Sequence, residues 1–372
     1  MRKLLWRSDS PLAVSGYALM TALFAPRVAA LGYEVVISAP SSYRGKPLEY
    51  GDCLIIGGAR DPHGNDVLAG DYQAHKADLL LTLCDLFALY PSASDIAGMN
   101  AAHLVPVDTE PAGEIDVATL RDGGGTPIAI SEHGRRMLAA EGCDPLYIPH
   151  GIETGLFTPG DPPEGPFTVG INAVNKDLSV RKRIPSQMLA FARFRERHPE
   201  ARLKIHSAAQ ASPGLNLRAV AGRLGIADAV DWPDLYSYMT SAIPAEAMAA
   251  WYRDLDVLSN CANEGFGLAV LEAQSCGVPV VVSDCSAGPE LCGAGWKVPG
   301  DLEWTDGHNA WWLNPYPRAI EAAYENAWQA REDGKMPAMR AKARTFAEGY
   351  DADLVLSTFW KPALERLEAG LR

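Results

Sequence analysis

The stretch NEGFGLAVLEAQSCGVPVVV, residues 263–282, decides the fold predicted for this chain. The segment 256–260 before it and the segment 278–283 at its end have the pattern of short buried strands. Parallel strands need a crossover connection, so the residues between them should form a helix and complete a βαβ unit. Gly277 suits the position just after that helix, and Pro279 prevents its continuation.

The glycines of this stretch indicate an anion-binding loop. Gly265 and Gly267 can adopt positive φ angles and let a ligand approach the backbone. The free N–H groups of the first helical turn point outward at the positive end of the helix dipole. We therefore expect an anion, most simply a phosphate, at the start of this helix.

Two carboxylates frame the glycines. Glu264 precedes them, and Glu272 lies on the second turn of the helix among apolar residues. An unpaired buried carboxylate costs on the order of several kcal/mol, so Glu272 needs a partner, and sugar hydroxyls would serve. A chance acidic residue followed by a solvated glutamate is the alternative.

The whole string, two glutamates separated by seven residues around Gly-Phe-Gly-Leu, resembles the signature of the retaining GT-B glycosyltransferases. These are the glycosyl transferases group 1, which include bacterial mannosyltransferases, sucrose synthases and glycogen synthases. The resemblance implies an α/β chain with two Rossmann-like domains that face one another across a cleft. It also implies that Glu264 contacts the transferred sugar and that Glu272 binds the ribose hydroxyls of the donor. The loop amides that would hold the donor diphosphate are those of Gly265, Phe266, Gly267 and Leu268.

Length and composition favour a two-domain globular protein. A chain of 372 residues is too long for one ordinary core, and 48% apolar with 21% charged residues is typical of soluble proteins. No run approaches the roughly 18 apolar residues that span a bilayer, and residues 1–7 lack a long apolar signal core. The seven scattered cysteines include no Cys-x-x-Cys pair, which favours reduced thiols. We expect a cytoplasmic protein without stable membrane insertion.

The net charge of −13 bears on the acceptor. Residues 1–160 contain 11 Lys and Arg against 19 Asp and Glu, a balance of −8. Acidic surfaces repel phosphate backbones and anionic lipid heads, so duplex DNA and membrane lipids are disfavoured as acceptors, although a local basic groove would escape this argument. A small-molecule hydroxyl and a modified base both remain open.

The clearest linker is PGDPPEGP at residues 159–166. We therefore predict an N-terminal, acceptor-side Rossmann-like domain at 1–160 and a nucleotide-sugar-binding domain at 166–340. By resemblance, a C-terminal helix at about 345–372 returns to the first domain.

Three positions of the first domain are candidate contacts. A strand at 2–7, a turn-rich loop and a helix from about Ala18 form the opening of a Rossmann-like half, and the resemblance makes Gly16 of this loop a contact of donor phosphates or acceptor. A plain connecting turn explains Gly16 equally well. Asp85 and Asp108 follow strands, at the sheet edge where ligands bind. The family usually has a histidine near Asp108, and an ordinary turn aspartate is the alternative for both.

Three adjacent cations in the second domain suggest a diphosphate clamp. Arg181, Lys182 and Arg183 follow a loop at 173–180 and lead into an amphipathic helix at 184–197. Arginine can bind a phosphate bidentately and lysine supplies a point charge. The family carries an arginine near Val174, which is absent here, so we assign the clamp to Arg181 and Lys182 only. A solvated basic patch is the alternative.

Three further segments complete the prediction. Trp232 follows a short strand at 229–233 and, by resemblance, lines the nucleobase. Residues 300–318, rich in Trp and Asn, suggest an irregular flap. The tail at 337–371 should be helical with a break at 350–351, and Phe359-Trp360 would anchor it.

Sugar transfer requires stabilisation of the leaving diphosphate, which the loop amides with Arg181 and Lys182 would provide without a divalent ion. No Asp-x-Asp motif stands at a strand end, so we predict no metal and no cofactor besides the UDP- or GDP-linked donor substrate. The resemblance implies retention. A double displacement would need a carboxylate nucleophile about 5 Å from its acid partner, and none is identified, so same-face attack is the default. Glu264, Asp108, Arg181 and Lys182 are the catalytic candidates.

Other functions fit parts of the pattern. A sugar-nucleotide epimerase or a phosphorylase would use the same scaffold, and a non-catalytic binding module would keep the donor site. A transferase acting on hydroxymethylated bases in nucleic acid is a third alternative. No Gly-x-Gly-x-x-Gly follows the first strand, so an NAD dehydrogenase is disfavoured. The donor base, the sugar, the acceptor and the oligomeric state stay open.

Overall fold

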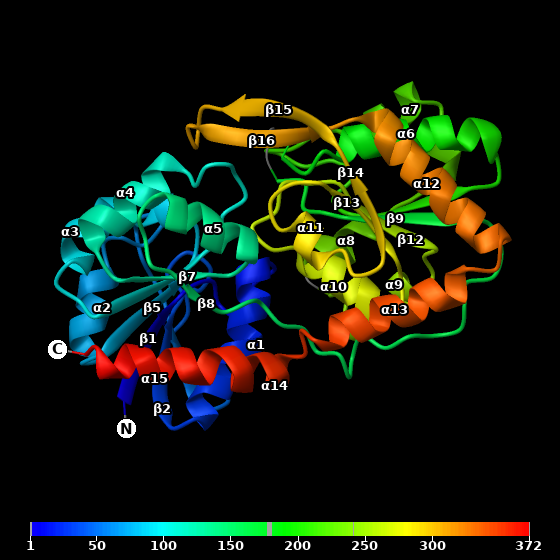
Figure 1. The fold of residues 1–372 in the computed structure, drawn as a ribbon. Helices are drawn as coiled ribbons and strands as arrows, with labels where there is room; N and C mark the ends of the chain where they lie inside the picture. The colour runs from blue at the N-terminus through cyan, green and yellow to red at the C-terminus, as the bar shows by residue number, and fades with distance from the viewer. Residues whose placement is uncertain (1, 177–180, 241, 372) are drawn as a thin grey trace. The chain divides into compact units, whose positions relative to one another are not determined.

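The computed structural model describes residues 2–176, 181–240 and 242–371, which form two compact units (Figure 1). The first unit comprises the chain up to Gly151 together with 305–310 and 352–372, and the second comprises 152–304 and 311–351. Residues 159–166, predicted as the linker, belong to the second unit. Each unit contains one parallel sheet with helices, as predicted.

The sheet of the first unit has the order β3-β4-β2-β1-β5-β6-β7-β8, and its neighbours are parallel except for the β3–β4 pair. Its strands are β1 (Arg2–Arg7), β2 (Tyr33–Ser38), β3 (Leu48–Tyr50), β4 (Cys53–Ile56), β5 (Leu79–Leu83), β6 (Ala101–Val105), β7 (Thr126–Ala129) and β8 (Leu146–Tyr147). Its α-helices are α1 (Gly16–Ala30), α2 (Leu68–Ala74), α3 (Ala93–Ile96), α4 (Glu114–Gly123), α5 (Glu132–Ala140), α14 (Ala352–Val355) and α15 (Lys361–Ala369).

The C-terminal tail of the chain is anchored in this unit by an aromatic cluster. Trp360 is 2% exposed, and its ring stacks on that of Trp6 with centroids 5.4 Å apart. The ring of Phe24 on α1 also contacts the Trp360 ring, with centroids 5.3 Å apart. The predicted anchor is confirmed, because burying large aromatic rings against one another fixes the tail to β1 and α1.

The sheet of the second unit has the order β11-β10-β9-β12-β13-β14, all parallel. Its strands are β9 (Thr168–Asn172), β10 (Arg202–His206), β11 (Val230–Asp231), β12 (Val257–Asn260), β13 (Val280–Ser283) and β14 (Gly295–Val298). Its α-helices are α6 (Ile184–Arg197), α7 (Leu217–Arg223), α8 (Leu235–Met239), α9 (Ala245–Arg253), α10 (Leu268–Ser275), α11 (Gly288–Leu291), α12 (Pro317–Glu332) and α13 (Met336–Glu348). This strand order places a topological switch point between β9 and β12, where doubly wound sheets bind ligands. The predicted β12–α10–β13 unit is present, with Leu258 paired to Val280.

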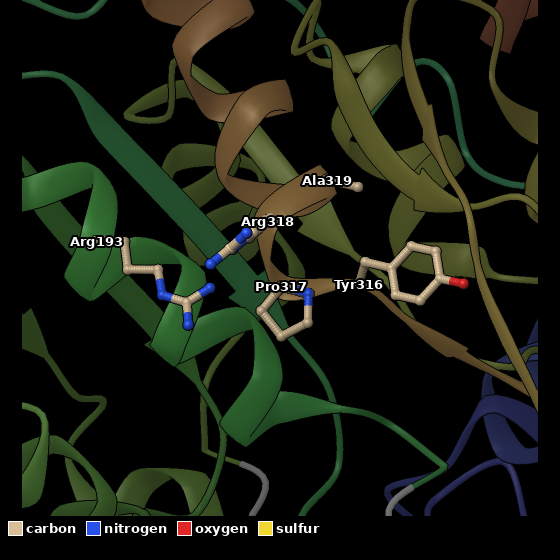
Figure 2. Close-up of a pocket in the computed structure, with 5 residues that line it drawn as sticks. All are labelled: Arg193, Tyr316, Pro317, Arg318 and Ala319. Atoms are coloured by element: carbon tan, nitrogen blue, oxygen red, sulfur yellow. The ribbon is translucent and has the colours of Figure 1, made fainter.

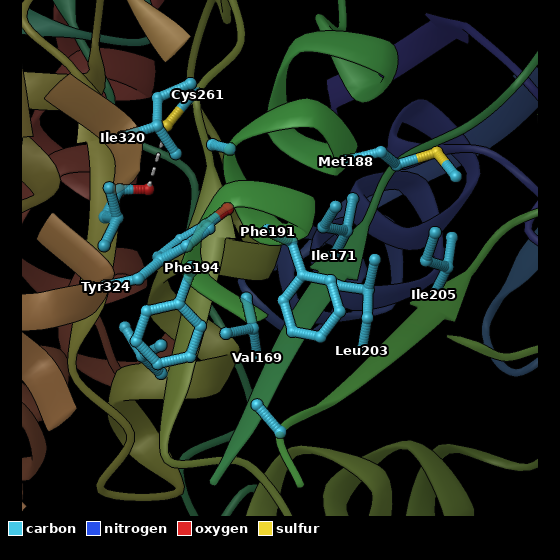
Figure 3. Packing of buried hydrophobic residues seen from close by; sticks show 14 of the residues in the cluster. Val169, Ile171, Met188, Phe191, Phe194, Leu203, Ile205, Cys261, Ile320 and Tyr324 are labelled. Atoms are coloured by element: carbon cyan, nitrogen blue, oxygen red, sulfur yellow. Dashed lines mark hydrogen bonds between the residues drawn. The ribbon is translucent and has the colours of Figure 1, made fainter. Parts of the chain in front are cut away.

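The core of the second unit shows why its helices stay on the sheet (Figure 3). Met188, Phe191 and Phe194 recur at three-residue spacing, so they share one face of α6, and all three are 0% exposed. They pack with strand residues such as Val169 and with Tyr324 of α12. Helices α6 and α12 lie side by side over this face of the sheet (Figure 1).

The segment predicted as an irregular flap at 300–318 is a β-hairpin, so that prediction was wrong. Strands β15 (Gly300–Thr305) and β16 (Ala310–Pro315) form a two-stranded sheet, and α12 begins at Pro317. The rings of Trp304 and Trp311 meet across the strands with centroids 5.0 Å apart. An Asp306-Gly307 turn between two short strand-like segments is a hairpin signal, which the unusual Trp and Asn content obscured. Over the described residues, no helix is long and apolar enough to span a membrane.

Candidate functional site

The start of α10 provides an uncapped helix N-terminus. Gly267, the residue before the helix, has φ +122° and ψ 61°, and no side chain accepts a hydrogen bond from the first turn. Of the two glycines that can adopt a positive φ, Gly267 does so and Gly265 does not, so one left-handed residue turns the loop into the helix. The helix ends as predicted. Gly277 has φ +79°, and the amides of Gly277 and Val278 donate hydrogen bonds to carbonyl oxygens in the last turn of α10.

The two predicted clamp residues lie against Glu264. The ammonium Nζ of Lys182 lies 2.5 Å from Oε1 of Glu264, and the guanidinium of Arg181 lies 3.5 Å from Oε2. The same guanidinium donates to the carbonyl oxygen of Asn263 at 2.8 Å. Residues 82 positions apart in the chain therefore meet beside the start of α10. The predicted loop at 173–180 lies partly outside the described residues, which omit 177–180.

This ion cluster keeps Glu264 ionised. Burial alone would raise the pKa of Glu264, but the charges and hydrogen bonds of Lys182 and Arg181 outweigh it and hold the pKa below its ordinary value. The three side chains are each about one-fifth exposed, so the cluster is accessible from solvent. Both cations thus lie with Glu264 beside the helix N-terminus, where positive charge would stabilise an anion.

Arg183, which was left out of the clamp, is engaged elsewhere. It is 4% exposed and has φ +49° at the start of α6. Its guanidinium forms an ion pair of 2.7 Å with Glu303 on β15. Its charge is therefore matched by the hairpin rather than by the Glu264 cluster.

Glu272 has a protein partner that the sequence did not reveal. The Tyr252 hydroxyl donates to Oε2 of Glu272 at 2.7 Å, and Nδ2 of Asn172 donates to the Tyr252 oxygen at 2.7 Å. Burial raises the pKa of Glu272, and the Tyr252 hydrogen bond opposes that shift. Tyr252 is fully buried at the end of α9. Sugar hydroxyls are thus not the only possible partners of this carboxylate.

The other predicted residues of the second unit have mixed surroundings. Phe266 is 5% exposed and packs on Tyr350, with ring centroids 6.0 Å apart, so its predicted donor contact would come from its backbone. Leu268 is the first residue of α10 and is partly buried. Trp232 follows β11, and the Arg218 guanidinium lies over its ring at 5.6 Å.

The first unit holds the remaining candidates. Gly16 is exposed at the start of α1, where Ser15 caps the helix and donates to Asp9. Asp85 follows β5 and accepts a hydrogen bond from the Tyr17 hydroxyl at 2.6 Å. Asp108 follows β6 and is partly buried. Gly16 and Asp108 therefore belong to a different unit from Glu264, Arg181 and Lys182.

Asp116, on the first turn of α4, joins these aspartates and was missed. It is 9% exposed and accepts a hydrogen bond from the Phe87 amide at 2.9 Å. Burial, together with the charges of Asp85 and Asp108, raises the pKa of Asp116 to about 7. A carboxyl that titrates near neutrality is a candidate for proton transfer. Only its place as an acidic residue in the first turn of α4 hinted at it, because the neighbouring aspartates come from other segments of the chain.

Asp116→Asn tests this environment through stability. The pKa of Asp116 is raised on folding, so its contribution to stability is present at low pH and is lost as the pH rises toward 7. Relative to wild type, the variant should gain roughly 2 kcal/mol between pH 5 and pH 8, since each pKa unit is worth about 1.4 kcal/mol. Urea denaturation at both pH values measures this. Asp122→Asn, on an exposed part of the same helix, should show no such gain, and an equal gain would contradict the assignment.

A surface hollow lies apart from these residues (Figure 2). It is lined by Arg193 of α6 and by residues 316–319 at the start of α12. None of these is a predicted site residue. In the part of the chain that the structure describes, no group of three His, Cys, Asp or Glu side chains is arranged as a metal site.

Comparisons with known proteins agree on one family. Residues 177–307 match the family model described as glycosyl transferases group 1. A D-inositol 3-phosphate glycosyltransferase of Segniliparus rotundus is 29% identical over 53% of this chain and 47% of its own length. The enzyme of the same name from Pseudarthrobacter chlorophenolicus is 30% identical over 62% of this chain and 54% of its own. The chain thus spans about half the length of these relatives.

Solved structures resemble the whole chain. Sucrose-phosphate synthase of Thermosynechococcus elongatus has a TM-score of 0.77 at 16% identity, covering 99% of this chain and 100% of that one. HepE of Anabaena, solved with UDP-glucose, has a TM-score of 0.69 at 16% identity and covers 98% and 100%. At this identity the likeness concerns the fold, and it confirms the predicted α/β architecture with two Rossmann-like units.

Proposed function

Since this chain belongs to the group 1 glycosyl transferases and has their GT-B fold, we propose that it transfers a sugar from a nucleoside-diphosphate sugar to a hydroxyl acceptor. The observation that carries this proposal is the meeting of Lys182, Arg181 and Glu264 at the uncapped start of α10. That arrangement suits an anion with a sugar attached.

The proposed donor site lies on the second unit. The amides of residues 265–268, together with Lys182 and Arg181, would hold the diphosphate, and Trp232 would line the base. Glu272 would accept the ribose hydroxyls. A UDP-linked donor is a reasonable first choice, because the structurally similar HepE was solved with UDP-glucose, and a GDP-linked donor is the second.

Charge stabilisation explains how these groups would promote transfer. As the bond between the sugar and the phosphate breaks, negative charge grows on the leaving diphosphate. Fixed amides and two cations in a partly buried site stabilise that charge without reorganisation during the reaction. Because the chain's own groups can supply this positive charge, we propose that no metal ion is required. Glu264, ionised by its two cations, would orient the sugar ring.

Retention at the anomeric carbon is part of the proposal and rests on the family resemblance. Attack of the acceptor on the face that the diphosphate leaves, assisted by that phosphate, would give this outcome. Asp85 and Asp108 at the carboxyl ends of strands, together with Asp116 on the first turn of α4, suit an acceptor rich in hydroxyl groups. The seven cysteines are free thiols, which supports a reducing compartment such as the cytoplasm.

The test is a transfer assay with a matched binding measurement. Purified protein is incubated with UDP- and GDP-sugars, polyol acceptors and hydroxymethylated DNA, in EDTA, and the product is identified by mass spectrometry and its anomer by NMR. We expect a glycosylated hydroxyl with the donor's anomeric configuration. Inversion, dependence on a divalent ion, or tight donor binding without turnover would each overturn the corresponding part of the proposal.

Glu272→Ala tests the ribose assignment. Losing the only proposed acceptor of the ribose hydroxyls should weaken binding of UDP about tenfold or more, since hydrogen bonds to charged groups contribute about 1.5–3 kcal/mol. Isothermal titration calorimetry measures the change. The 2′-deoxy nucleotide should lose less affinity than UDP. An unchanged dissociation constant for UDP would remove Glu272 from the site.

A further inference from the structure

A one-directional chain of hydrogen bonds ends on Glu272. Oδ1 of Asn172 can only accept, so Nδ1 of His206, 3.1 Å away, must donate to it. The amide nitrogen of Asn172 then donates to the Tyr252 oxygen, which leaves the single Tyr252 proton for Glu272. Each donor in the series His206, Asn172, Tyr252 therefore points toward the carboxylate.

The surroundings of these hydrogen-bonded residues keep His206 neutral and Tyr252 protonated. Burial lowers the pKa of His206 to about 4, so its ring is neutral at pH 7 and carries one proton. Burial, followed by the nearby charge of Glu272, holds the pKa of Tyr252 well above its ordinary value, so the hydroxyl keeps its proton. Tyr252 is 0% exposed, and its ring is fixed by contacts with Phe157 and Trp251 at centroid distances of 6.0 and 5.2 Å. The donor that faces Glu272 is thus rigid as well as protonated.

This series of hydrogen bonds lies at the edge of the sheet where ligands bind in doubly wound folds. Asn172 ends β9 and His206 ends β10, beside the switch point between β9 and β12. Tyr252 occupies Oε2 of Glu272, whereas among the described residues nothing hydrogen-bonds to Oε1. The carboxylate is therefore held by one oxygen, and the other remains available to a ligand.

We propose that Tyr252 is a positioning residue for Glu272, and that the chain from His206 through Asn172 holds Tyr252 in place to orient this carboxylate toward the ribose hydroxyls of the donor. The inference rests on the proposed function, which assigns the ribose to Glu272. The inference adds specificity for ribose over deoxyribose. A carboxylate that is fixed by a buried donor has its other oxygen pre-aligned for the hydroxyls of a ribose. A deoxyribose lacks one of these hydroxyls and so gains less from the alignment.

Tyr252→Phe is the central test. It keeps the ring contacts but removes the hydroxyl. With UDP as the probe, the dissociation constant should rise about tenfold, and the preference for UDP over 2′-deoxy-UDP should fall toward one. A merely structural tyrosine would not change this preference. GDP and 2′-deoxy-GDP are measured in parallel.

The pH profile gives a second readout. The Tyr252 hydrogen bond lowers the pKa of Glu272 against the effect of burial, so its removal should raise that pKa, and UDP binding should fail at a higher pH than in wild type as the pH is lowered. Other ionisable groups near this site are shared by both proteins and so cancel in the comparison. They are Cys276, which follows α10, and the cations around that thiol, namely Arg253 of α9 and Arg340 and Arg344 of α13.

Two controls separate positioning from damage to the fold. Tyr324→Phe removes the hydroxyl of another fully buried tyrosine of the same unit, which donates to Ser259 at 2.8 Å, and it should leave UDP affinity and preference unchanged. Asn172→Ala should shift both in the same direction as Tyr252→Phe, but less. It carries the test if the tyrosine variant does not fold.

Combining Tyr252→Phe with Glu272→Ala decides whether the tyrosine acts through the carboxylate. We expect the double variant to bind UDP as weakly as Glu272→Ala alone. Additive losses, or an unchanged UDP preference in Tyr252→Phe, would overturn the inference while leaving the ribose assignment intact. Unchanged UDP binding in Glu272→Ala would instead overturn the proposed function of that residue.

Discussion

Lys182→Met is expected to lower the transfer rate about 100- to 1,000-fold. Lys182 lies 2.5 Å from Glu264 beside the start of α10, where its charge would stabilise the leaving diphosphate. Removing one preorganised group of this kind costs about 10²–10³ in kcat. Methionine keeps the length of the aliphatic stem, so the packing around it changes little. Steady-state kinetics with saturating donor measure the effect, which should fall on kcat more than on KM.

A lysine of the same unit provides the matched control. Lys204 on β10 forms an ion pair of the same kind with Asp254, at 2.7 Å, outside the candidate site. Lys204→Met should keep wild-type kinetics, because a pair with an exposed carboxylate contributes little to the fold. If Lys182→Met retained most of the wild-type kcat, or if both variants lost activity equally, Lys182 would not be a catalytic cation.

Glu264→Gln is expected to separate binding from transfer. The carboxylate is ionised because Lys182 and Arg181 lower its pKa, so the amide removes one negative charge beside the proposed diphosphate site. UDP should then bind more tightly, by about tenfold, since the negative charge of Glu264 no longer competes for the two cations. Transfer should nevertheless fall about 100-fold, because the group proposed to orient the sugar has lost its charge. Calorimetry with UDP and turnover assays give the two numbers.

The opposite changes in affinity and rate make this prediction specific. Glu325→Gln is the matched control. Glu325 on α12 also lies between two basic side chains, with Arg197 at 2.5 Å and His198 at 2.9 Å. That variant should change neither UDP affinity nor transfer. Full activity in Glu264→Gln would contradict the sugar-orienting assignment, and weaker UDP binding would contradict the view that Glu264 neutralises the clamp.

Local signals sufficed for the elements around the glycine loop before α10. The βαβ unit, the left-handed Gly267, and the helix end at Gly277 were predictable because each depends on residues within a few positions of one another. Helix α6 was predictable for the same reason, since Phe191 and Phe194 lie on one apolar face. The hairpin at β15–β16 was missed although its Asp-Gly turn was visible in the sequence.

The partners of the site residues could not be predicted from the sequence. Lys182 and Glu264 are 82 positions apart, and Asn172 and Tyr252 are 80 apart, so no periodicity links them. The raised pKa of Asp116 depends first on its burial and then on the charges of Asp85 and Asp108 from two other segments. Side chains this far apart in the sequence meet only when the order of the strands brings distant segments to one edge of a sheet.

The sequence by itself determined two Rossmann-like units and a glycine-led helix start, because backbone preferences and apolar periodicity are local properties. The tertiary structure decided which charges neutralise Glu264, which hydroxyl holds Glu272 and which carboxyl of the first unit titrates near neutrality. Those outcomes depend on distance and burial, and Coulomb and desolvation energies change steeply with both. Distance and burial are fixed only when the sheets assemble.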